Sequence, residues 1–170
     1  MRILLLLGLL VPMASWGQEL QVQKAKLDLK VPYSLGSHDL KATNITGVVQ
    51  WDEEKKSLVS GDLSLAVADI QSTDATLKCH ILESLTLDYK TSKFPSEHVC
   101  DDNKLPSEGA NAPKFTHILA RLVKPVTLDA QEVEIEWEIR GQKRTQLIPA
   151  TLRQSEDKKQ VELEASWVMK

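Results

Sequence analysis

EVEIEWEIR, residues 132–140, alternates apolar and charged side chains without a break. Successive side chains of a β-strand point to opposite faces, so this segment predicts a strand with one buried face and one charged, solvated face. GQKR (141–144) predicts a tight turn, and TQLIPATL (145–152) predicts the returning strand. Pro149 within that strand favours an edge position, a bulge or a break. The alternating apolar residues of the first strand are Val133, Ile135, Trp137 and Ile139.

The same period of two recurs along most of the chain. It predicts about eight strands joined by short polar turns, which is the pattern of an all-β antiparallel barrel or sandwich. A polar loop, QSEDKKQ (154–160), separates the last two strands. The apolar positions that share a face are Leu27, Leu29 and Val31; Ile45, Val49 and Trp51; Leu63, Leu65 and Val67; Ile118, Ala120 and Leu122; and Val161, Leu163, Ala165 and Trp167.

One segment changes period. Between Thr73 and about Tyr89 the apolar residues recur at steps of three and four, as on one face of a helix. Ser72, Thr73 or Asp74 can cap its start, and the region of Pro95 ends it. The sequence therefore predicts one short helix at about 73–90, across the mouth or side of a barrel.

The N-terminus predicts export. MRILLLLGLLVPMASWGQ places one arginine before an apolar run, residues 3–14, and small residues before Gln18. The run is too short to span a bilayer as a helix but fits a secretory signal peptide. We therefore predict a signal peptide at 1–17 and one domain at 18–170, with an uncleaved anchor as the less favoured alternative.

Composition narrows the function classes. The chain has 21 basic and 24 acidic residues and no basic run. This balance argues against nucleic-acid binding and against polybasic attachment to a membrane. Paired catalytic carboxylates, glycine-rich phosphate loops and Ser-His-Asp arrangements are not visible in the sequence. We therefore predict a binding protein that is not an enzyme and has no cofactor.

Several motifs, taken in order, carry a resemblance to a known family. GVVQWDEEKKSLVSGDLSLAVADIQSTDA (47–75) is followed by LKCHILE (77–83), KFP (93–95) and EWEIRGQKRTQLIPATL (136–152). Together these resemble the YceI-like lipid- and polyisoprenoid-binding family. The resemblance extends over roughly residues 27–167. The chain departs from the family pattern where Cys79 replaces an acidic residue before the helix histidine.

The resemblance implies a lipocalin-like antiparallel barrel in the periplasm that holds a long isoprenoid or another lipid in an apolar lumen. It also implies that Lys78 and His80 meet a polar head group, although a solvated helix face explains both residues equally well. Inward-facing tryptophans are more often plain core than ligand contacts. The ligand-binding positions expected on this basis are Val49, Trp51, Leu65, Val67, Lys78, His80, Ile81, Ile118, Ala120, Val133, Ile135, Trp137 and Ile139.

LKCHILE, together with EHVC (97–100), allows three interpretations. In an exported chain with two cysteines, a Cys79–Cys100 disulfide is favoured. The alternatives are a Cys₂His₂ metal site made with His80 and His98, and a Cys79 nucleophile with one of these histidines as base. His80 and Glu83 are also spaced to interact on one helix face.

Two other function classes stay open at this point. One is a metal-binding module that uses Cys79, His80, His98 and Cys100. The other is a barrel filled by its own side chains that acts through its surface on a protein partner. Ligand identity and oligomeric state, including a homodimer, are not decided by the sequence.

Overall fold

The computed structural model describes residues 18–22, 25, 27–33, 36–157 and 160–165. The predicted signal peptide, Trp167 and the side chains of Leu27, Leu29 and Val31 lie outside this described part.

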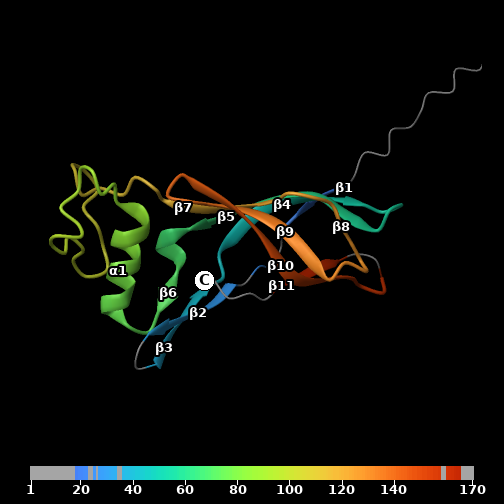
Figure 1. Ribbon diagram of the computed structural model, residues 1–170, viewed down its shortest axis with the longest axis horizontal. Coiled ribbons are helices and arrows are strands. Elements are labelled where there is room, and N and C mark those ends of the chain that lie inside the picture. Colours follow the sequence, from blue (N-terminus) through green and yellow to red (C-terminus); the bar gives the residue numbers. More distant parts are fainter. Residues whose placement is uncertain (1–17, 23–24, 26, 34–35, 158–159, 166–170) are drawn as a thin grey trace, which may run out of the picture.

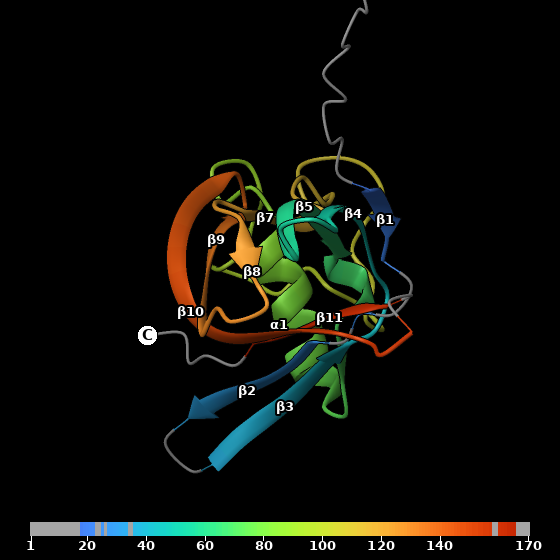
Figure 2. The ribbon, with the colours of Figure 1, turned by 90° about the vertical axis from the view of Figure 1, so that its right-hand side faces the viewer.

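An eight-stranded antiparallel sheet curls round to form a half-barrel (Figures 1 and 2). Neighbouring strands follow the order β1-β4-β5-β7-β9-β10-β11, and β8 pairs with β5. This arrangement confirms the predicted all-β, lipocalin-like class. The strands are β1 (Gln18–Gln21), β4 (Ile45–Asp52), β5 (Ser57–Ala66), β7 (His117–Leu122), β8 (Val126–Thr127), β9 (Glu132–Ile139), β10 (Gln142–Gln154) and β11 (Val161–Ala165).

A second, three-stranded sheet was not predicted as a separate unit. It consists of β2 (Leu27–Tyr33), β3 (Gly36–Ala42) and β6 (Gln71–Ser72), in the order β2-β3-β6. The β2–β3 hairpin projects from the half-barrel below the curled sheet in Figure 2. The short β6 follows η1, a 3-10 turn at Val67–Asp69, and leads into the helix.

The β9–β10 hairpin corrects the predicted turn. The turn consists of Arg140 and Gly141, which have φ of 54° and 69°, the signature of the two-residue turns that match strand twist. Residues 142–144 of the expected turn belong to β10. The guanidinium of Arg140 lies 3.6 Å from the centre of the Tyr89 ring and donates to the carbonyl of Leu87 at 2.9 Å. These contacts stabilise a non-glycine residue at positive φ.

Pro149 marks a change of partner. Strand β10 runs through it without a break and pairs with β9 as far as Pro149, then with β11 from Ala150 onward. Proline has no N–H to donate to a ladder, so it fits the position where one ladder ends. The structure therefore shows a change of pairing partner at Pro149, where the sequence predicted an edge position, a bulge or a break.

The predicted helix is α1 (Ala75–Thr86), shorter than the expected 73–90. Asp74 caps its start by accepting a hydrogen bond from the N–H of Leu77 at 3.1 Å. The helix ends because Leu87 adopts an extended conformation and is fully buried. Figure 1 places α1 at one end of the half-barrel, beside the long loop that leads to β7.

Among the described residues, most of the buried apolar side chains form two clusters. The first, at the helix end, packs α1 against β5 and η1; the second lies toward the β4–β5 turn. The buried members of the first cluster are Leu40, Ala42, Leu65, Val67, Ile70, Ile81 and Leu82. Those of the second are Trp51, Leu58, Val126, Val133, Ile148, Ala150 and Leu152.

Candidate functional site

The inner face of the curled sheet carries most of the expected ligand-binding residues, and the structure distributes them between the two clusters. Leu65, Val67, Ile81 and Ile118 belong to or pack against the first cluster, and Val49, Trp51, Val133, Ile135 and Trp137 belong to or pack against the second. Trp51 is buried core, with its indole N–H bound to Glu53 at 2.7 Å.

At the border of the second cluster, the strand registers align residues in rows across the sheet. One row joins Leu63, Ala120 and Trp137, and the next joins Leu122 and Ile135. Apart from the buried Ala120, these side chains are only half-buried, as is Ile139 further along β9. The middle of the inner face is therefore apolar and still reached by solvent.

Two open depressions lie elsewhere on the surface. One crosses the outer face of β5, β7, β9 and β10, with a volume of about 170 Å³, and Ala120 is the one expected ligand residue that lines it. The other, of about 320 Å³, lies beside the start of α1 and is lined by Cys79, His98, Cys100 and Asn103 among others.

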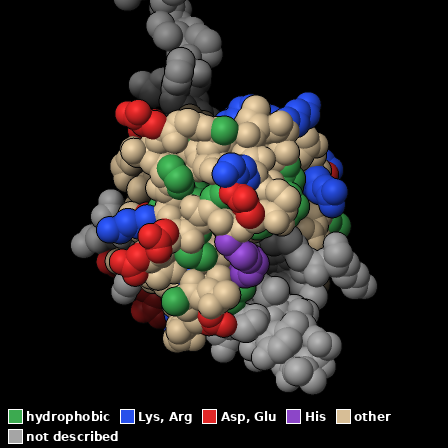
Figure 3. All heavy atoms as spheres, turned by 90° about the vertical axis from the view of Figure 1, so that its left-hand side faces the viewer, with side chains coloured by type: hydrophobic (Ala, Val, Ile, Leu, Met, Phe, Trp, Pro, Cys, Tyr) green, Lys and Arg blue, Asp and Glu red, His purple; other side chains and the backbone are tan. Residues whose placement is uncertain are grey.

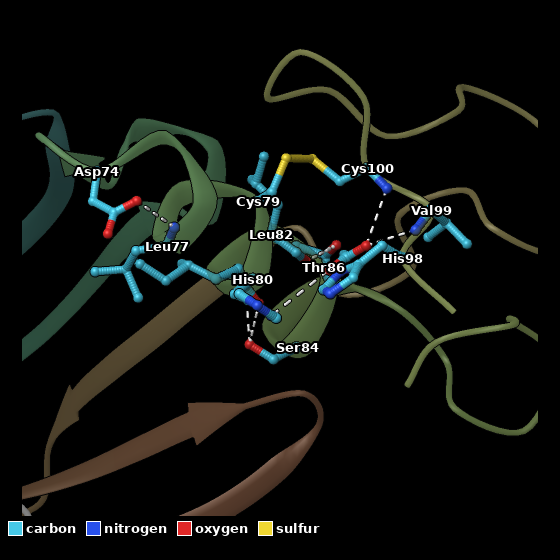
Figure 4. Close-up of polar contacts among 12 residues, drawn as sticks. Asp74, Leu77, Cys79, His80, Leu82, Ser84, Thr86, His98, Val99 and Cys100 are labelled. Atoms are coloured by element: carbon cyan, nitrogen blue, oxygen red, sulfur yellow. Dashed lines mark hydrogen bonds and ion pairs between the residues drawn. A yellow bond between two sulfur atoms is a disulfide. The ribbon is translucent and has the colours of Figure 1, made fainter. Parts of the chain in front are cut away.

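The cysteine of LKCHILE, Cys79, forms a disulfide. Cys79 on α1 is bonded to Cys100, with 5.6 Å between their Cα atoms, which confirms the favoured interpretation. The bond removes both thiolates, so the Cys₂His₂ metal site and the Cys79 nucleophile are wrong. Figure 4 shows the bond joining the helix to the loop that carries His98 and Val99.

The backbone of Cys100 also contacts a carboxylate, Glu83, which the sequence analysis noted only as a partner of His80. Glu83 is fully buried. Its Oε1 accepts hydrogen bonds from the backbone N–H groups of Val99 at 2.7 Å and Cys100 at 3.0 Å. Its Oε2 lies 2.9 Å from Nδ1 of His98 and 3.9 Å from Nδ1 of His80.

These contacts keep Glu83 ionised. Burial, the largest single influence, raises the pKa of this carboxyl, but the hydrogen bonds from Val99, His98 and Cys100 together outweigh it, and the pKa of Glu83 is lowered. The two imidazoles meet edge to face, with 4.6 Å between ring centres. His80, Glu83 and His98 thus form a cluster of two exposed histidines and one buried anion. Figure 4 labels the two histidines.

Neither a protein-family model nor a curated protein sequence matches this chain. Among the described residues, no helix combines the length and the apolar character needed to cross a bilayer.

Lys78, which was expected beside a ligand head group, forms hydrogen bonds with nearby backbone carbonyls. Its ammonium donates to the carbonyls of Ala68, at 2.6 Å, and Ile70. Burial, partly offset by Asp69, lowers the pKa of Lys78. The side chain therefore ties α1 to the η1 segment, and a head-group role for Lys78 stays a prediction.

Arg144 is a cation on the inner face that the sequence analysis missed. It lies directly opposite Trp137 in the β9–β10 ladder and is exposed. Within the described residues no acidic side chain forms an ion pair with it. Sequence alternation through β10 could have placed it there, but residues 141–144 were assigned to the turn.

The glutamates of β9 form the solvated outer face that the alternation predicts. Glu134 pairs with Lys124 at 2.7 Å, and Glu136 pairs with Lys143 at 3.0 Å. Cations from the neighbouring segments therefore neutralise part of this stripe.

Proposed function

We propose that this protein is an exported, non-catalytic binder of an amphiphile with a long hydrophobic chain, as its resemblance to the YceI-like family implies. The observation that carries the proposal is the partly buried apolar surface on the inner face, which borders the second core cluster. Leu63, Leu122, Ile135 and Trp137 form this surface. Contiguous apolar side chains that stay partly accessible are a common feature of surfaces that bind a hydrophobic ligand.

The dimensions suit a chain-like ligand. The eight residues of β9 extend over about 27 Å at the usual rise of a strand. Each CH₂ group of a ligand that leaves water contributes about 0.8 kcal/mol, so even a partly enclosed chain binds usefully. Arg144 supplies a cation at the edge of the same face, which favours an anionic head group.

Native mass spectrometry of protein purified without detergent tests for a copurifying lipid. Binding is then measured with an isoprenyl phosphate and with the isoprenol of the same chain length. Ile135→Gln on the inner face should lower the affinity for both ligands by about tenfold or more, because it replaces an apolar contact by an amide. Leu147→Gln, on the exposed outer face, is the matched control and should leave both affinities unchanged.

Arg144→Gln separates the head group from the chain. It should lower the affinity for the isoprenyl phosphate and leave the affinity for the isoprenol unaffected. Arg153→Gln, on the outer face, should change neither affinity. Folding of each variant is checked by circular dichroism. The proposal fails if neither ligand saturates the wild-type protein, or if inner-face and outer-face substitutions have equal effects.

The same proposal includes a periplasmic location. The Cys79–Cys100 disulfide supports an oxidising compartment, where such bonds persist. Cell fractionation followed by N-terminal sequencing tests this, with Gln18 expected as the first residue. An intact Met1 in a cytoplasmic fraction would contradict it.

A further inference from the structure

We propose that His80, Glu83 and His98 bind one divalent late transition-metal ion, such as Zn²⁺, at the helix end of the molecule. This site is independent of the amphiphile-binding face. Its donors are two imidazoles and one carboxylate, and their ligand atoms all lie within 4.8 Å of one another.

The donor set is one that zinc uses. Two histidines and one glutamate, with the fourth position open to water or another ligand, make up a known class of zinc centre. Imidazole and carboxylate also bind Cu²⁺ and Ni²⁺, whereas Mg²⁺ prefers an all-oxygen shell. The donor types therefore favour a late transition metal over a hard cation.

The spacing fits with small rotations. Ligands bonded to one tetrahedral zinc at about 2.1 Å are roughly 3.4 Å apart. Oε2 of Glu83 lies 2.9 Å from Nδ1 of His98 and 3.9 Å from Nδ1 of His80, so these two distances bracket that value. The side chain of His98 is 63% exposed and that of His80 is 47% exposed. Both imidazoles can therefore rotate to meet an ion beside the fixed carboxylate.

The buried ligand is held in place beforehand. The backbone N–H groups of Val99 and Cys100 occupy Oε1 of Glu83, which directs Oε2 toward the two histidines. Such second-shell contacts fix the orientation of metal ligands and tune their affinity. The neighbouring Cys79–Cys100 disulfide joins the two segments that supply the donors. His80 is the residue after Cys79, and His98 lies two residues before Cys100.

A plain hydrogen bond explains only part of the cluster. It accounts for His98 beside Glu83, but His80 lies beyond hydrogen-bonding distance of the same oxygen and still packs against the His98 ring. Figure 3, which faces the helix end, shows a patch of histidine side chains at the surface, where an ion from solution can reach them.

The test is isothermal titration of the purified, untagged, chelator-treated protein with Zn²⁺, with Mg²⁺ as the hard-cation control. One Zn²⁺ should bind per chain and raise the melting temperature, because the ion binds the folded state, while Mg²⁺ should do neither. His80→Gln and His98→Gln should each lower the zinc affinity by at least about tenfold. His117→Gln, an exposed histidine on β7, is the matched control and should bind as the wild type does.

Co²⁺ provides a second readout. Its visible spectrum should report a four-coordinate site in the wild type and in His117→Gln, and the signal should be lost in both cluster variants. Because His80 and His98 are exposed, their substitution should leave the fold intact, which circular dichroism checks. Absence of one-to-one zinc binding, or binding that survives both cluster substitutions, would overturn the proposal.

Discussion

Nδ1 of His98 lies 2.9 Å from Oε2 of Glu83, so a largely exposed side chain contacts a carboxylate that no solvent reaches. The other oxygen of Glu83 holds two backbone N–H groups of the same loop. Glu83 therefore attaches residues 98–100, which have no regular secondary structure, to helix α1.

Replacing this carboxylate should destabilise the protein strongly. Glu83→Ala leaves two partly buried backbone donors without a partner. Each would cost about 1–3 kcal/mol if fully buried, so we expect a loss of about 2–4 kcal/mol in the free energy of unfolding. Urea denaturation measures it. Glu97→Ala is the control, because its exposed ion pair with Lys93 contributes about 0–1 kcal/mol. Equal midpoints for the two variants would contradict this role for Glu83.

Loss of the disulfide should also lower stability. The bond closes a loop between cysteines 21 positions apart, which in the chain-entropy model corresponds to about 3 kcal/mol. The double variant Cys79→Ala/Cys100→Ala should therefore unfold at lower urea concentration than the oxidised wild type. Adding a reductant should lower the wild-type midpoint and leave that of the variant unchanged. A wild-type midpoint indifferent to reductant would refute the prediction.

Acid should remove a contribution from Glu53, at the opposite end of the half-barrel. Hydrogen bonds from Lys56, Trp51 and Gln154 lower the pKa of Glu53 from 4.5 to about 2. Because the folded-state pKa is depressed, this contribution is fully present above the unfolded-state pKa and is lost as pH falls toward about 2.

Glu53→Gln tests this linkage. The variant should melt below the wild type at neutral pH, and the gap should narrow as the pH falls from 4.5 toward 2. Thermal unfolding followed by circular dichroism over that range measures it. A gap that stays constant with pH would show that the charge of Glu53 contributes nothing.

Gly47 should tolerate a side chain less well than Gly61, although both lie on the β4–β5 ladder. A Cβ at Gly47 would lie 2.3 Å from the carbonyl oxygen of Asp62, which belongs to the backbone and cannot rotate away. At Gly61 the nearest atom, 3.1 Å away, is a methyl of Val49. Gly47→Ala should cost about 1–3 kcal/mol and Gly61→Ala clearly less, as measured by urea denaturation. The reverse order would contradict the packing described here.

The sequence predicts the strands well where one face is buried. In β9 the alternation alone identifies the inner residues, because the outer face of that strand is charged. In β7 the same period identifies Ile118, Ala120 and Leu122, although Leu119 is exposed on the outer face. The alternation also identifies Trp51 and Val49, which line β4 as expected. It does not predict that β2 and β3 leave the main sheet, since their pairing depends on contacts that no local pattern records.

The site was predicted only in part, for a similar reason. The disulfide follows from two cysteines in a chain predicted to be exported, with no other thiol to compete. The meeting of His98 with Glu83 depends on the path of an irregular loop, 15 residues beyond the helix position it contacts. The position of Arg144 on the inner face was missed because the turn is shorter than predicted. The turn consists of Arg140 and Gly141, both at positive φ, and the letters GQKR alone do not show that the strand begins again at Gln142.

The first and last strands along the order of the curled sheet, β1 and β11, are both poor templates for fibre growth. The edge strand β1 has four residues, QELQ, mostly exposed and polar. At the other edge, β11 reads VELEA, with Glu162 and Glu164 on the outward positions. Short edges that carry like charges repel a second copy that approaches edge to edge. At these two strands, the addition of a strand from a second copy is therefore disfavoured even at high protein concentration.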